Sequence, residues 1–106
     1  MGYSEDLAAR VRARLSHFDD LSERSVLSGL GFFIDGRMAV AVLDDRLCLR
    51  VDETEDAASL SDVAAFPLVF AGRPVRGWVC ISKDNLDAAS LDDWVKRGVY
   101  GLGLPM

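Results

Sequence analysis

An apolar stretch over residues 29–52, divided by two polar turns, restricts the fold of this chain more than any other feature. The turns are Asp35-Gly36 and Asp44-Asp45, and the three runs around them are short and mostly apolar. Asp-Gly is typical of a type I′ hairpin turn, because glycine adopts positive φ without strain. Three apolar runs joined by turns this short predict a three-stranded antiparallel meander, against which the rest of the chain must pack.

Helical spacing on either side of this meander predicts the covering layer. We expect the N-terminal helix to begin after Ser4, a typical N-cap, and to continue for about 14 residues. A final helix is expected to be capped by Ser90 and stopped near Gly101. The apolar stripes of these two helices are Leu7, Val11, Leu15 and Phe18 in the first, and Leu91, Trp94, Val95 and Val99 in the last.

Between these helices the sequence predicts one more short helix and one more hairpin. Residues 57–64 carry a weak helical stripe, whereas Pro67 bars a helix and begins an extended run. The runs 68–70 and 75–81 form the second predicted hairpin. Residues 19–28 are polar and fit either an extended lead-in to the sheet or a loop. The resulting order is helix, three strands, helix, two strands, helix, which is a single α+β domain of two layers over residues 1–106.

Charge and composition narrow the possible partners. The net charge of −5 argues against direct nucleic-acid binding, because neutralising phosphates requires an excess of Lys and Arg. We therefore interpret Arg10, Arg12 and Arg14 as a solvated helix face. The chain shows neither an apolar run near the ~20 residues of a membrane span nor a signal-peptide layout at its start. It is expected in the cytoplasm, with Cys48 and Cys80 as reduced, half-buried thiols.

The sequence contains no recognisable catalytic or metal-binding motif. His17 is the only histidine, which excludes a multi-histidine metal site, and no serine and aspartate partners for it are in view. Adjacent carboxylates such as Asp92-Asp93 are explained by helix caps and turns. Cys-x-x-Cys, Walker and EF-hand spacings do not occur. We expect neither an enzyme nor a bound cofactor.

Two segments resemble the N-terminal domain of the TfoX/Sxy proteins. They are Phe-Phe-Ile-Asp-Gly-Arg-Met-Ala-Val-Ala-Val at 32–42, continuing into Leu-Cys-Leu-Arg-Val-Asp at 47–52, and Phe-Ala-Gly-Arg-Pro-Val-Arg-Gly-Trp-Val at 70–79. The resemblance implies an α-β3-α-β2-α fold whose five-stranded antiparallel sheet has the order 1-2-3-5-4. It also implies a regulatory role, because the named members regulate competence genes in bacteria. The chain departs from the family at residues 25–29, Ser-Val-Leu-Ser-Gly, where the family has an Arg-Met-Phe-Gly-Gly-like segment. It resembles only the first domain of the full-length regulators, so the resemblance implies the domain rather than transcriptional activation.

Strand alternation divides the predicted sheet into two faces. Bulky branched side chains on one face suit a core beneath helices that lie mainly on that side. The opposite face combines small residues with Trp and Arg, which is typical of an association surface, unless the first or last helix covers it. The predicted interface or ligand residues are Ala39, Ala41, Leu43, Cys48, Arg50, Arg76, Trp78 and Cys80.

Two functions follow as hypotheses. The first is a non-catalytic regulatory or protein-interaction domain that forms a homodimer, or binds a protein partner, through the open sheet face. The alternative is a small-anion-binding domain with a pocket around Trp78, Arg50 and Arg76, since guanidinium groups suit anions. In the strand order that the resemblance implies, Cys48 lies near Cys80; we expect two inert thiols rather than a redox-sensitive pair.

Overall fold

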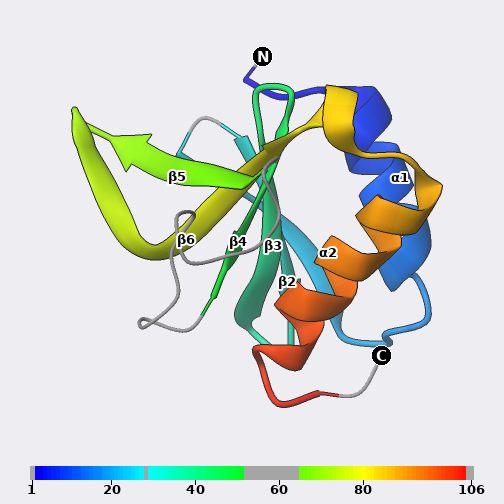
Figure 1. The fold of residues 1–106 in the computed structure, drawn as a ribbon. Coiled ribbons are helices and arrows are strands. Elements are labelled where there is room, and N and C mark those ends of the chain that lie inside the picture. Colours follow the sequence, from blue (N-terminus) through cyan, green and yellow to red (C-terminus); the bar gives the residue numbers. More distant parts are fainter. Residues whose placement is uncertain (1, 28, 52–64, 105–106) are drawn as a thin grey trace.

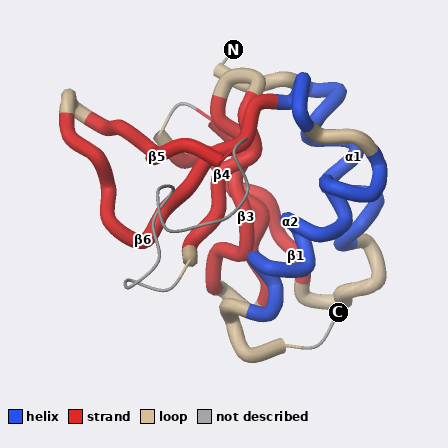
Figure 2. Tube along the Cα trace, viewed as in Figure 1, coloured by secondary structure: helices blue, strands red, loops and turns tan. Residues whose placement is uncertain are grey.

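An antiparallel sheet with helices along one of its faces makes up the computed structural model (Figures 1 and 2). The structure describes residues 2–27, 29–51 and 65–104. Its elements in chain order are α1 (Glu5–Leu15), β1 (Leu21–Val26), β2 (Gly29–Ile34), β3 (Arg37–Leu43), β4 (Arg46–Arg50), β5 (Ala65–Phe70), β6 (Arg73–Ser82), the 3-10 helix η1 (Lys83–Asn85) and α2 (Ala88–Tyr100).

The sheet has six strands in the order β1-β2-β3-β4-β6-β5, so the prediction of five strands is wrong. The additional strand is β1, which the sequence left open as a lead-in or a loop. It pairs with β2 from Leu21, opposite Ile34, to Val26, opposite Gly29. The other five strands keep the order that the family resemblance implies. The short helix predicted over residues 57–64 lies outside the described residues.

The turns of the predicted meander form where the sequence places them. Asp35 and Gly36 have φ values of 53° and 77°, both positive as a type I′ turn requires, and Asp44 has a φ of 55°. Ala71 and Gly72, at 54° and 78°, connect β5 to β6 in the same way. Each turn therefore reverses the chain within two or three residues, which brings consecutive strands into direct contact.

The helix caps explain where the two helices begin. Ser4 is the N-cap of α1, as predicted, and its hydroxyl accepts a hydrogen bond from the Leu7 N–H at 3.2 Å. The helix is shorter than predicted and ends at Leu15. In α2 the N-cap is Asp87 rather than Ser90, whose hydroxyl instead completes a reciprocal capping box with Asp87. Neither helix of the described residues is long and apolar enough to cross a membrane.

The apolar stripes of α1 and α2 pack on one sheet face and form the main core, here called the helix-side cluster. Leu7, Val11 and Leu15 of α1 are fully buried, as are Leu91, Val95 and Val99 of α2. These helical residues contact alternate positions of four strands. The fully buried strand residues of the cluster are Phe32, Val40, Val42, Leu47, Leu49, Val79 and Ile81.

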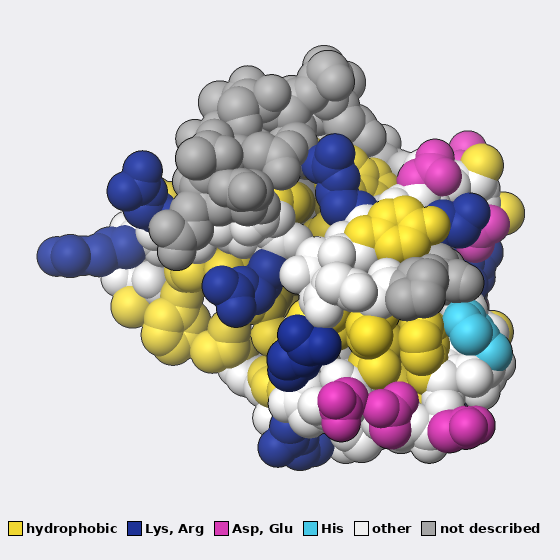
Figure 3. Space-filling model, turned by 90° about the horizontal axis from the view of Figure 1, so that it is seen from below, with side chains coloured by type: hydrophobic (Ala, Val, Ile, Leu, Met, Phe, Trp, Pro, Cys, Tyr) yellow, Lys and Arg dark blue, Asp and Glu magenta, His cyan; other side chains and the backbone are white. Residues whose placement is uncertain are grey.

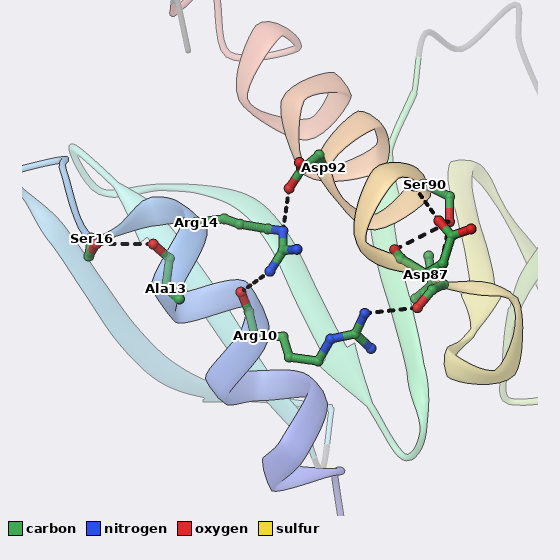
Figure 4. Close-up of polar contacts among 8 residues, drawn as sticks. Arg10, Ala13, Arg14, Ser16, Asp87, Ser90 and Asp92 are labelled. Carbon is green, nitrogen blue, oxygen red and sulfur yellow. Dashed lines mark hydrogen bonds and ion pairs between the residues drawn. The ribbon is translucent and has the colours of Figure 1, made fainter.

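The arginines of α1 stay partly exposed, as expected of a solvated face, but they also bind neighbouring elements. Arg10 donates to the Leu86 carbonyl at 2.8 Å, and Arg14 forms an ion pair with Asp92 of α2. Figure 4 shows both side chains extending from α1 towards α2 and the segment before it. Arg12 forms a two-point ion pair with Glu23 of β1, at 2.6 and 2.8 Å. These contacts fix α1 against α2 and β1, which leaves little of the α1 charge for a phosphate backbone.

Candidate functional site

The sheet face opposite the helices carries an apolar cluster of its own, here called the second cluster. It joins residues from the outermost strands, β1 and β5, with residues from the central strands. Strands at opposite edges can share one cluster only if the sheet curls strongly, so the face predicted to lie open is largely buried. The buried members are Ala41, Leu43, Cys48, Leu68 and Cys80, and Val26, Met38, Phe66, Val75 and Trp78 are packed against them while only partly buried.

Ala39 was expected on this face and lies on the other one. The register of β2 and β3 shifts between Phe32 and Phe33, which pair with Val40 and Met38, so that Ala39 is left without a partner. This bulge turns Ala39 into the helix-side cluster and turns Met38 into the second cluster. The remaining β3 positions, Ala41 and Leu43, lie where the alternation predicts.

A second irregularity reorders the face of β6. Gly77 has a φ of 78°, which interrupts the alternation between Val75 and Trp78. Strict alternation along β6 places Val75 on the same face as Val79, but Val75 packs in the second cluster with Trp78. Arg76 is exposed and lines neither of the two hollows described below. Of the predicted set of Trp78, Arg50 and Arg76, the first two are therefore brought together and Arg76 lies apart.

Cys48 and Cys80 lie directly opposite each other on β4 and β6, as the strand order implied by the resemblance predicts. Both are free thiols and both are fully buried, rather than half-buried as expected. A hydrogen bond to Cys80 and burial among apolar side chains raise the pKa of the Cys48 thiol. Because a thiolate is the reactive form, this environment makes Cys48 a poor nucleophile.

An apolar hollow of about 250 Å³ lies where the ends of β1 and β5 approach each other across the second cluster. Val75 and Trp78 form part of its wall, and Leu27 and Phe70 lie at its rim. Leu27 is 51% exposed and Phe70 is 55% exposed, which is unusual for large apolar side chains. Neither residue belongs to the predicted site. The alternation of Phe66, Leu68 and Phe70 along β5 is the sequence signal that could have identified Phe70.

A larger groove of about 710 Å³ lies between the C-terminal end of α2 and the sheet, and we call it the arginine groove. Its lining includes Arg37 of β3, Arg50 of β4, Trp78 of β6, and Arg97 and Tyr100 of α2. Arg50 pairs directly with Trp78 in the β4–β6 register. Figure 3, which views the molecule from this end, shows Lys and Arg side chains among hydrophobic ones in the middle of the face, with Asp and Glu towards its edges. Arg37, Arg97 and Tyr100 were missed because sequence spacing does not connect β3 with the end of α2.

The comparison with known families agrees with the resemblance described from the sequence. The family model of the TfoX N-terminal domain matches residues 13–101, which is most of the chain. No curated protein and no solved structure matches the chain. Among the described residues, no three His, Cys, Asp or Glu side chains are grouped so that they could hold a metal ion.

Proposed function

Because the chain belongs to the TfoX N-terminal domain family, we propose that it is a non-catalytic regulatory domain that acts by associating with a second copy of itself. Regulation of competence in bacteria, the role of the family's named members, is the process in which we propose it takes part. The observation that carries the proposed self-association is the apolar hollow with its two exposed rim residues, Leu27 and Phe70. Exposed apolar groups of this size at one place are typical of a surface that another protein covers.

A second copy of the chain fits this surface because the surface carries both a hollow and a projecting side chain. In a two-fold dimer the same patch of each copy forms the contact. A self-complementary patch must therefore offer both a hollow and a side chain that fills the hollow of the other copy. A cavity of roughly 150 Å³ is enough to hold a benzene molecule. The hollow, at about 250 Å³, therefore has room for the phenyl ring of Phe70 from the other copy.

The absence of charge in the hollow also favours a second copy over a charged partner. The described residues that line it are all apolar, so a polar or ionic partner would gain nothing from them and would lose hydration. A contact built around one hollow and two rim side chains is small for a stable dimer, which usually buries about 800 Å² per partner. We therefore expect a weak dimer, with a dissociation constant on the order of micromolar.

The cysteines support a cytoplasmic location as part of this proposal. Cys48 and Cys80 lie opposite each other on neighbouring strands and are unbridged. Adjacent thiols that stay reduced are typical of a reducing compartment.

The proposed dimer is tested by sedimentation velocity over a range of concentrations. Wild type should shift from monomer to dimer as concentration rises, and Phe70→Asp and Leu27→Asp should remain monomeric, because a buried carboxylate in the hollow would be unpaired. Both residues are more than half exposed in the monomer, so the substitutions leave the core intact.

Val69→Asp is the matched control for Phe70→Asp. Val69 is the preceding residue of β5, is 53% exposed, and does not line the hollow. The same new charge there should leave the monomer–dimer equilibrium unchanged. A wild type that stays monomeric at its highest soluble concentration contradicts the proposal. Equal loss of dimer in Val69→Asp and Phe70→Asp would also contradict it, since the contact would then run along the edge of β5.

A further inference from the structure

The arginine groove is positively charged on a protein that is negative overall. Three arginines, Arg37, Arg50 and Arg97, line it, and no Asp or Glu is among its described lining residues. The whole chain has a net charge of −5. A cleft lined by one sign of charge concentrates the field within it, so this groove attracts anions although the protein as a whole repels them.

Two of these arginines have no protein partner within the described part of the chain. The ion pairs there belong to Arg12, Arg14 and Arg46, all of which lie outside the groove. Arg37 and Arg50 are exposed and form no such pair. Within the described residues, their guanidinium groups thus have donors available for a ligand. The guanidinium of Arg97 lies 5.5 Å from the centre of the Trp94 ring, which fixes part of the wall. Arg37 and Arg50 therefore supply the donors for the ligand.

The rest of the groove is aromatic and aliphatic. Trp78 and Tyr100 line it together with Val51 and Leu102. A planar guanidinium group binds phosphate or carboxylate oxygens at two points, and aromatic walls accept a flat ring. A volume of about 710 Å³ falls in the ordinary range for small-molecule sites. We infer that the arginine groove binds a small organic phosphate that carries a planar ring, of about the size of a mononucleotide.

The C-terminal end of α2 repels an anion in the groove less than a helix C-terminus usually does. The last carbonyls of a helix carry partial negative charge, which repels anions. Here the Gly101 N–H donates to the Arg97 carbonyl at 3.0 Å, and the Leu102 N–H donates to the Val99 carbonyl at 3.0 Å. These hydrogen bonds engage two of the last four carbonyls, and Arg97 adds a full positive charge in the same turn.

Isothermal titration calorimetry with AMP, adenosine and inorganic phosphate tests the inference. AMP should bind, and adenosine and inorganic phosphate should each bind at least about tenfold more weakly, because each makes only one of the two contacts. Arg50→Gln and Arg37→Gln should each weaken AMP binding by about tenfold or more, which corresponds to one lost charge-assisted contact. Tyr100→Ala should weaken AMP binding without changing the weak binding of inorganic phosphate.

Arg76→Gln is the matched control, because Arg76 is also an exposed arginine of the sheet but does not line the groove. It should bind AMP as wild type does. No heat of AMP binding, or equal weakening by Arg76→Gln and Arg50→Gln, overturns the inference. Inorganic phosphate binding as tightly as AMP would overturn the part that assigns a planar ring.

A single-stranded oligonucleotide also carries phosphates and planar rings, so its binding is measured as a separate outcome of the test. If it binds far more tightly than AMP, and with a steep dependence on salt, the groove follows a nucleic-acid strand and the mononucleotide inference is wrong. The inference is independent of the proposed dimer. Phe70→Asp should bind AMP normally, and Arg50→Gln should dimerise normally, so the failure of one does not imply the failure of the other.

Discussion

Cys48 and Cys80 show how strongly the surroundings of a side chain control its chemistry. Each is a potential nucleophile, and the two face each other across the β4–β6 pair. Their neighbours in the second cluster are apolar, and the Cys48 thiol has a raised pKa because it is hydrogen-bonded to Cys80 and buried. Position alone would suggest a reactive pair, whereas full burial limits the access of a dissolved reagent to either thiol.

We predict that neither thiol reacts with an aromatic disulfide reagent in the native protein at pH 8. Both are fully buried, so the reagent reaches them only when the second cluster opens. After unfolding in guanidinium chloride, both cysteines of the chain should react within minutes. The absorbance change before and after unfolding measures this. Rapid reaction of the native protein would show that the second cluster opens easily and would restore the redox hypothesis.

The contact between α2 and β3 positions the last turns of the helix, and with them one wall of the arginine groove. Gly98 lies against β3 so closely that an added Cβ would be 2.6 Å from the Ala39 carbonyl oxygen and 2.6 Å from Val40 Cγ1. Ala39 reaches this place only because of the bulge opposite Phe32 and Phe33. The bulge and the glycine therefore fit each other, and both determine how deep the helix lies.

We predict that Gly98→Ala destabilises the protein although alanine favours helix. The gain in helix propensity is about 1 kcal/mol, whereas forcing a methyl group against backbone and core atoms costs about 1–3 kcal/mol and shifts the helix. Gly101→Ala is the control at the end of the same helix. A Cβ there meets ordinary contacts of 3.4 Å or longer, and its φ of −61° suits alanine. Urea unfolding should show a lower midpoint for Gly98→Ala alone; a lower midpoint for both would show that any change at this helix end is harmful.

The sequence predicts those elements whose pattern is local. Asp35-Gly36 specifies its turn through backbone conformation, and the stripes of α1 and α2 specify their buried faces, so these predictions are confirmed. Phe18 is the exception, since it lies beyond the end of α1 and is only partly buried. β1 was not predicted as a strand because only its two end residues, Leu21 and Val26, are apolar. Its four central residues are exposed, so this edge strand shows no alternation of apolar and polar residues. The caps of α2 show a smaller error: Asp87 and Ser90 are both good capping residues, and the choice between them depends on the path of η1.

The candidate site was predicted only where strand alternation continues without interruption. Ala41, Cys48 and Cys80 lie on the expected face, but Ala39 and Val75 do not, because a bulge and the positive φ of Gly77 each reverse the alternation. Neither irregularity leaves a periodic trace in the sequence. The arginine groove was predicted only in part. Trp78 and Arg50 were expected to line an anion pocket, whereas Arg37 and Arg97 join them only because α2 packs on β3.

Acid should destabilise the domain, because two carboxylates are held in their charged form by folding. The Glu23 pKa is lowered by its hydrogen bond and ion pair with Arg12, and the Asp87 pKa is lowered by hydrogen bonds from Ser90. A pKa that is lower in the folded state gives stability that is present above the unfolded value, near 4.5 for Glu and 3.8 for Asp, and is lost as the pH falls through the folded value.

We therefore predict that the free energy of unfolding is flat from pH 7 to about pH 5 and decreases below that. Glu23→Gln should make the decrease shallower and should cost no more than about 1 kcal/mol at pH 7, because its pair with Arg12 is largely exposed. Urea titrations at pH 7, 5, 4 and 3 measure the free energy of unfolding of the wild type and of Glu23→Gln. Asp45→Asn, a change at an exposed carboxylate of the turn between β3 and β4, should reproduce the wild-type profile. A steeper decrease in Glu23→Gln than in wild type would contradict the assignment.

Met38 and Trp78 line both the apolar hollow and the arginine groove, so these two side chains form a wall between them. A rotamer of either side chain that enlarges one space diminishes the other. If an anion in the groove and a partner at the hollow prefer different positions of the indole, their binding energies are coupled, and thermodynamics requires that each alters the affinity of the other by the same factor. The bulge in β3 places Met38 beside both spaces, so any such coupling would pass through Met38 and Trp78.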